Sequence, residues 1–65
     1  MNTSQKNTNN ALHYLATQMM NQAGETWEDC CNSAERTASR LRANGISKGS
    51  IASHLYAEAV RFEDM

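Results

Sequence analysis

Apolar residues in this chain recur at intervals of three and four, the spacing that places side chains on one face of an α-helix. Three such stretches are present, and we expect helices over residues 10–23, 27–44 and 48–62. No stretch alternates apolar and polar residues as a half-buried strand does. The pattern therefore predicts an all-α fold, a small three-helix bundle.

Each predicted helix has one stripe of apolar residues that faces the core. The three stripes are Leu12, Leu15, Ala16, Met19 and Ala23; Trp27, Cys30, Cys31, Ala34, Ala38 and Leu41; and Ile51, Leu55, Ala59 and Phe62. Residues 1–9, by contrast, are rich in Asn, Thr and Ser and have no helical period. We therefore expect residues 1–9 to form a disordered polar arm and residues 10–65 to form a single helical domain.

Residues that satisfy unpaired backbone groups mark the predicted helix ends. Asn10 and Thr26 suit the N-cap positions of the first two helices, and Gly24 suits the left-handed position after the first helix. These signals do not depend on the hydrophobic spacing, yet they support the same boundaries.

The short segment between the second and third predicted helices forms a tight joint. Gly45 suits the left-handed residue of a Schellman motif, in which Ile46 packs on Leu41. Ser47 suits the N-cap of the third helix, and Ile46 with Ile51 suits the hydrophobic staple across its start. One isoleucine thus ends one helix and begins the next.

Composition narrows the class of protein. The chain has 65 residues and a formal net charge of −1, so it allows one small domain and lacks the basic excess of most nucleic-acid binders. No apolar run approaches the roughly 20 residues that span a bilayer, and the first residues lack the apolar stretch of a secretory signal. Cys30 and Cys31 are adjacent and cannot build a disulfide framework. We therefore expect a cytoplasmic protein with no membrane partner.

The sequence gives no sign of catalysis or metal binding. The soft ligands are Cys30, Cys31, His13 and His54, and their spacings do not match the paired ligands of zinc sites. Cys31 and His54 can be imagined as a nucleophile and base, but no third orienting group or oxyanion loop accompanies them. We therefore predict no enzyme activity, no metal and no cofactor.

A small dimeric helix-turn-helix regulator that binds DNA is the alternative function. The joint at residues 45–47, followed by Ile51 and Leu55, resembles the turn and second helix of helix-turn-helix proteins. Leu41 stands where that motif often has a small residue. The first turns of the third helix also lack a dominant Arg, Asn or Gln to read base edges.

Arg40, Arg42 and Lys48 form a basic corner beside this joint. The two arginines complement the dipole at the end of the second helix, which is ordinary helix stabilisation. Lys48 opposes the dipole at the start of the third helix, so stability does not explain its position. We expect this basic corner to contact either DNA or an acidic protein surface.

Protein binding is the function that the sequence favours. Tyr14, Tyr56 and Val60 lie off the core stripes, and tyrosine is enriched at protein interfaces. Tyr56 and Val60 widen the apolar arc of the third helix to about half its circumference, which indicates cover from another protein or from a second copy in a homodimer.

We therefore predict a non-enzymatic protein-interaction module. Its expected partner-binding residues are Tyr14, Tyr56, Val60, Arg40, Arg42 and Lys48. By analogy of size and helical architecture alone, it is comparable with accessory proteins of phages and mobile elements that inhibit a host complex, such as anti-CRISPR inhibitors.

Overall fold

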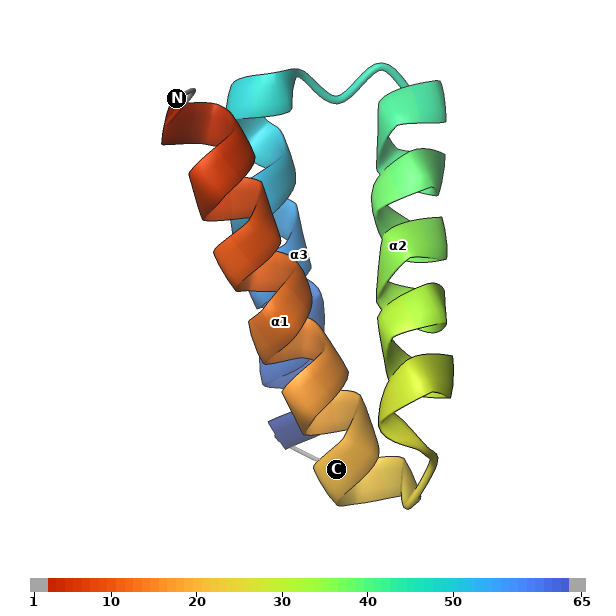
Figure 1. Cartoon of the computed structure of the whole chain (residues 1–65). Helices are drawn as coiled ribbons and strands as arrows, with labels where there is room; N and C mark the ends of the chain where they lie inside the picture. Colours follow the sequence, from red (N-terminus) through yellow and green to blue (C-terminus); the bar gives the residue numbers. More distant parts are fainter. Residues whose placement is uncertain (1–2, 64–65) are drawn as a thin grey trace.

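Three helices form a bundle in which successive helices run antiparallel (Figure 1). The structure is a computed structural model that describes residues 3–63. Helix α1 spans Thr3–Ala23, α2 spans Trp27–Ala43 and α3 spans Lys48–Glu63, with no strand among the described residues. The predicted all-α three-helix bundle is confirmed.

The predicted bounds of the second and third helices are confirmed to within one residue. The predicted start of the first helix at Asn10 is wrong, because α1 begins at Thr3. Residues 3–9 are therefore helical and do not form the disordered arm that we predicted, while Met1 and Asn2 lie outside the described residues.

Thr8 explains the longer first helix. It is only 5% exposed and lies one turn before Ala11, which is fully buried. The buried face of α1 therefore continues into the polar segment, where Gln5 also donates a side-chain hydrogen bond of 3.0 Å to Asn9. A pattern based on large apolar residues misses this extension, because threonine contributes only a short side chain to the buried face.

Helix α1 is the centre of the bundle. It packs most extensively against α3, then against α2, while α2 and α3 meet least. Among the described residues, five of the nine buried hydrophobic ones are alanines: Ala11, Ala16, Ala34, Ala38 and Ala59. Leu15, Ile51 and Leu55 are the largest fully buried aliphatic side chains. So small a core leaves the fold dependent on each of these three residues.

The predicted Schellman joint between α2 and α3 is confirmed. Gly45 has a φ of +88°, and its N–H donates to the Arg42 carbonyl at 3.0 Å. The N–H of Ile46 donates to the Leu41 carbonyl at 3.1 Å, and the Ile46 side chain packs against the core. These two bonds satisfy carbonyls that the end of a helix leaves free.

Two other predicted end signals, at Thr26 and Gly24, are confirmed. Thr26 is the N-cap of α2, and its hydroxyl accepts the Asp29 N–H at 3.2 Å. Gly24 has a φ of +71°, and its N–H donates to the Met20 carbonyl at 3.1 Å, which ends α1. Ser47 precedes α3 as predicted, but its hydroxyl donates to the Ser50 hydroxyl at 3.1 Å and does not accept a backbone N–H as an N-cap side chain would.

Candidate interaction surfaces

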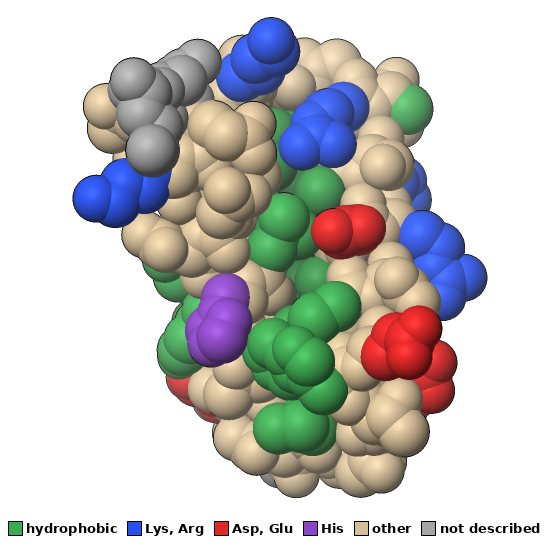
Figure 2. Space-filling model, in the orientation of Figure 1, with side chains coloured by type: hydrophobic (Ala, Val, Ile, Leu, Met, Phe, Trp, Pro, Cys, Tyr) green, Lys and Arg blue, Asp and Glu red, His purple; other side chains and the backbone are tan. Residues whose placement is uncertain are grey.

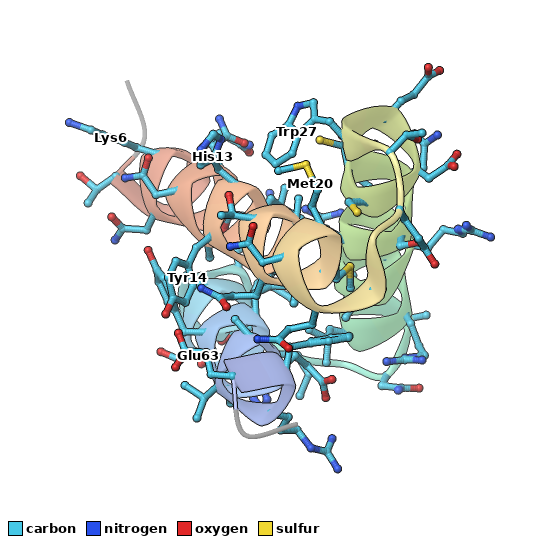
Figure 3. All side chains as sticks on the ribbon, turned by 90° about the horizontal axis from the view of Figure 1, so that it is seen from below. Lys6, His13, Tyr14, Met20, Trp27 and Glu63 are labelled. Carbon is cyan, nitrogen blue, oxygen red and sulfur yellow. The ribbon has the colours of Figure 1, made fainter. Side chains whose placement is uncertain are left out.

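Tyr14 of α1 and Tyr56 of α3 pack against each other on one side of the bundle. Their ring centroids are 5.5 Å apart and the rings are inclined by 47°. The Tyr14 hydroxyl donates a hydrogen bond to the Glu63 carboxylate, and Figure 3 shows these two residues on the same side of α1. Tyr56 and Val60 remain 40% and 47% exposed. We call Tyr14, Tyr56, Val60 and Glu63 the aromatic surface.

The hydrogen bond from Tyr14 fixes the orientation of the aromatic pair. It raises the pKa of the Tyr14 phenol above its ordinary value of 10.0, and partial burial and the charge of Glu63 act in the same direction. The phenol therefore keeps its proton at neutral pH and remains a donor to Glu63. Tyr14, held at both its ring and its hydroxyl, in turn supports the exposed ring of Tyr56.

Arg42 of the basic corner does not extend the aromatic surface. Arg40, Arg42 and Lys48 are all exposed. Arg42 lines a hollow between α1 and α2, whereas Tyr14 contacts α3. Within residues 3–63, the ion pair is that of Arg61 with Glu58 at 3.1 Å, so the basic corner has no acidic partner there. Of the six predicted residues, the structure thus brings Tyr14 and Tyr56 together and places Arg42 on another side of the bundle.

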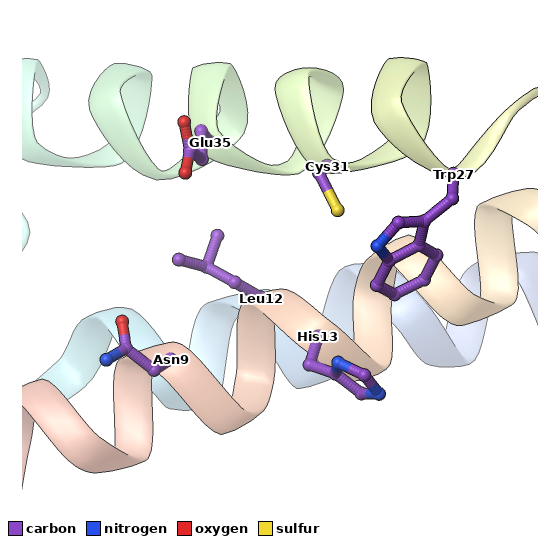
Figure 4. Close-up of a pocket in the computed structure, with 6 residues that line it drawn as sticks. All are labelled: Asn9, Leu12, His13, Trp27, Cys31 and Glu35. Atoms are coloured by element: carbon purple, nitrogen blue, oxygen red, sulfur yellow. The ribbon is translucent and has the colours of Figure 1, made fainter.

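A groove between α1 and α2 was not among the predicted sites. It encloses about 210 Å³, and we call it the α1–α2 groove. Its lining residues are Asn9, Leu12, His13, Trp27, Cys31 and Glu35 (Figure 4). His13 and Trp27 meet edge to face, with ring centroids 5.1 Å apart and planes at 63°.

Trp27 corrects the predicted core. We placed it on the stripe of the second helix, but it is 39% exposed at the first residue of α2. The buried residues of that helix are Cys30, Ala34 and Ala38, and Trp27 lies on the flank of this stripe. Glu35, which is exposed and follows Trp27 on the same flank, is the sequence signal that this flank faces solvent.

The α1–α2 groove continues into an exposed apolar strip. Met20 is 36% exposed, and Figure 3 shows it beside Trp27. Figure 2 shows apolar side chains along the junction of α1 and α2, with basic side chains at the end where α1 begins and most of the acidic ones toward the opposite end. This face therefore has a charge gradient along the helices.

The cysteines differ in their access to this groove. Cys30 is buried in the core, and burial raises the pKa of its thiol, which disfavours the nucleophilic thiolate. Cys31 is half-buried, and its sulfur points into the α1–α2 groove (Figure 4). Across residues 3–63, no three His, Cys, Asp or Glu side chains converge as a metal site would require.

Comparisons with known proteins indicate no function for this chain, so a proposal has to rest on its surfaces. No protein-family model, curated protein or solved structure matches the chain. None of the three helices, over the part of the chain that the structure describes, has the length and apolar character needed to cross a membrane.

Proposed function

We propose that this protein is a non-enzymatic interaction module that binds another protein through its aromatic surface. The observation that carries this proposal is the packing of Tyr14 on Tyr56 with the Tyr14 hydroxyl bonded to Glu63. Aromatic side chains that are already ordered lose little conformational entropy on binding. Val60, one turn beyond Tyr56, extends the same exposed face.

The partner that fits best carries an apolar patch for the aromatic surface and has a net negative charge. Arg40, Arg42 and Lys48 are exposed, and their charges would steer such a partner toward the molecule. We place this activity in the cytoplasm, where thiols such as Cys30 and Cys31 remain free. By the analogy of size and architecture, the partner is a host protein complex that the module inhibits.

The arrangement of α2 and α3 supports protein binding over DNA reading. The helices of a helix-turn-helix motif cross at about 90–120°, which lets the second helix enter the major groove. Here α2 and α3 run antiparallel along the bundle (Figure 1) and have the smallest packing contact of the three pairs. A regulator that binds DNA as a dimer remains the second candidate because Lys48 is exposed at the start of α3.

A comparison of baits tests the proposal. Tagged wild type, Tyr56→Ala and His54→Ala would capture proteins from the native cytosol, and the strongest ligand would then be purified and titrated by calorimetry. His54 is exposed on α3 but lies away from the aromatic surface, so it is the matched control. We expect Tyr56→Ala to weaken binding about tenfold or more, as a central interface tyrosine does, and His54→Ala to leave it unchanged.

Equal binding of the purified ligand to Tyr56→Ala and wild type would refute the aromatic surface as its site. The DNA alternative is measured separately, by fluorescence anisotropy with random duplex DNA. At about 50 mM salt a DNA-binding protein should bind, with affinity that falls steeply as salt rises. Such binding would favour the regulator, and its absence would eliminate it.

A further inference from the structure

The α1–α2 groove has two unlike ends. Large aromatic rings stand at one end, whereas the other end, which we call the open end, has none. Figure 4 shows Trp27 and His13 at one end, Asn9 and Glu35 at the other, and Cys31 between them. A two-fold axis near Cys31, running across the helices, would exchange these ends between two copies of the chain. We infer that this groove is the interface of a symmetric homodimer, in which Trp27 of each copy fills the open end of the other.

The size of the hollow favours a side chain as its occupant. Its volume is about 210 Å³, whereas small-molecule sites usually enclose about 300–1,000 Å³. Leu12 and Cys31 supply an apolar floor on which an indole ring can rest. Insertion of Trp27 would remove from water a ring that is 39% exposed in the single chain.

The charges on the face that holds the groove favour the antiparallel arrangement of the two copies. Basic side chains lie at the end of this face where α1 begins, and most of the acidic ones lie toward the opposite end (Figure 2). Of the three arginines in the second half of α2, Arg42 lies on this side, whereas Arg36 and Arg40 lie on the opposite face of the helix and do not contribute. In the antiparallel arrangement the acidic end of one copy faces the basic end of the other. A parallel arrangement would bring like charges together, which is unfavourable.

Glu35 is the acidic exception in the basic half of α2, and the same symmetry gives it a partner. It lies at the open end of the groove, opposite the end that holds His13. When the two ends are exchanged, Glu35 of one copy approaches His13 of the other, whose ring N–H can donate to the carboxylate. The dimer therefore pairs an apolar contact at Trp27 with a polar contact at Glu35.

This dimer does not depend on the proposed binding function. Figure 3 shows Trp27, His13 and Met20 on the side of α1 away from Tyr14 and Glu63. The aromatic surface thus remains free, and a dimer would present two copies of it. The two surfaces can also be tested by separate variants.

Sedimentation equilibrium over a range of concentrations tests the dimer. We expect the mass to rise from 7.2 kDa toward twice that value. Trp27→Ala should weaken association about tenfold or more, as loss of a central anchor does, with unchanged helical circular dichroism. Tyr56→Ala, which removes an equally exposed aromatic ring on the other side, should leave association unchanged. A wild-type protein that stays monomeric at about 1 mM, the weak end of specific affinities, would overturn the inference. Two other results would also overturn it: a Trp27→Ala variant that associates as tightly as wild type, or a Tyr56→Ala variant that no longer associates.

A mixing experiment tests the contact between copies directly. His13→Glu alone would place two carboxylates together at each end of the dimer, and Glu35→Lys alone would remove the acceptor, so each variant should associate weakly. An equimolar mixture should recover the dimer, because one new ion pair and one original pair form between unlike copies. A contact within one chain cannot give this recovery. A mixture that associates no better than the separate variants would overturn the assigned pairing and the two-fold arrangement built on it.

Discussion

Leu15→Ala should remove most of the stability of this fold. Leu15 is fully buried in the middle of α1, the helix that packs on both others. Five of the other eight buried hydrophobic residues within residues 3–63 are alanines, which cannot extend into the space that the leucine leaves. Leu→Ala changes at buried sites cost about 2–5 kcal/mol, with the larger values where the cavity does not collapse. We therefore expect a loss of about 3–5 kcal/mol.

That loss is comparable with the whole stability of a domain of this size. A single core in a chain below about 70–80 residues rarely supplies more than about 3–5 kcal/mol. Leu15→Ala should consequently be largely unfolded at 25 °C, or show a midpoint lowered by about 4–8 °C for each kcal/mol lost. The control is Val60→Ala, which shortens a side chain that is 47% exposed and should cost less than about 1 kcal/mol.

Urea titration followed by helical circular dichroism measures both variants. All samples need the same protein concentration, because association would add to the apparent stability. A loss below about 1 kcal/mol for Leu15→Ala would refute the reasoning, since it would mean that the core relaxes around the missing side chain. An equal loss in Val60→Ala would refute the assignment of Val60 to the surface.

Three further predictions concern single residues. Gly45→Ala should lower the free energy of unfolding by about 1–2 kcal/mol, because φ is +88° there. Gly49→Ala, in a helix with open space around the residue, should raise it by up to about 1 kcal/mol. Thermal melts in which both variants shift in the same direction would contradict this. Thr26→Ala should lose about 1 kcal/mol through the lost N-cap, measured by urea titration, and no loss would mean that the cap contributes nothing. Carbon NMR of the Tyr14 ring should show a pKa above 10.0 that falls toward 10.0 in Glu63→Gln. Because the unfolded phenol ionises first, the stabilisation is present below pH 10.0 and is lost as pH rises through the raised pKa; an unchanged pKa in the variant would contradict the bond.

Local signals in the sequence predicted the helix ends well. The Schellman bonds at Gly45, the cap at Thr26 and the left-handed Gly24 all occur where residue chemistry places them. These features involve residues within about one helical turn of each other, so the chain specifies them without reference to the rest of the fold.

The start of α1 and the position of Trp27 could not be predicted in the same way. Thr8 is buried because other helices cover that part of α1, and no rule on polar residues reveals such cover. Trp27 has the spacing of a core residue, but α2 presents its small residues Cys30 and Ala34 to the bundle and leaves the large ring on the flank. Helical spacing gives the side of a helix only to within a broad arc, and packing chooses within that arc.

The candidate surfaces were likewise predictable within one helix but not between helices. The sequence by itself determined that Tyr56 and Val60 share one face of a helix, because residues four apart always do. Only the tertiary structure decided that Tyr14 joins them, that Arg42 lies on another side, and that Trp27 and Glu35 border one groove. The physical reason is that contacts within a helix follow from its geometry, whereas contacts between helices depend on how small side chains let the three rods approach and rotate against one another.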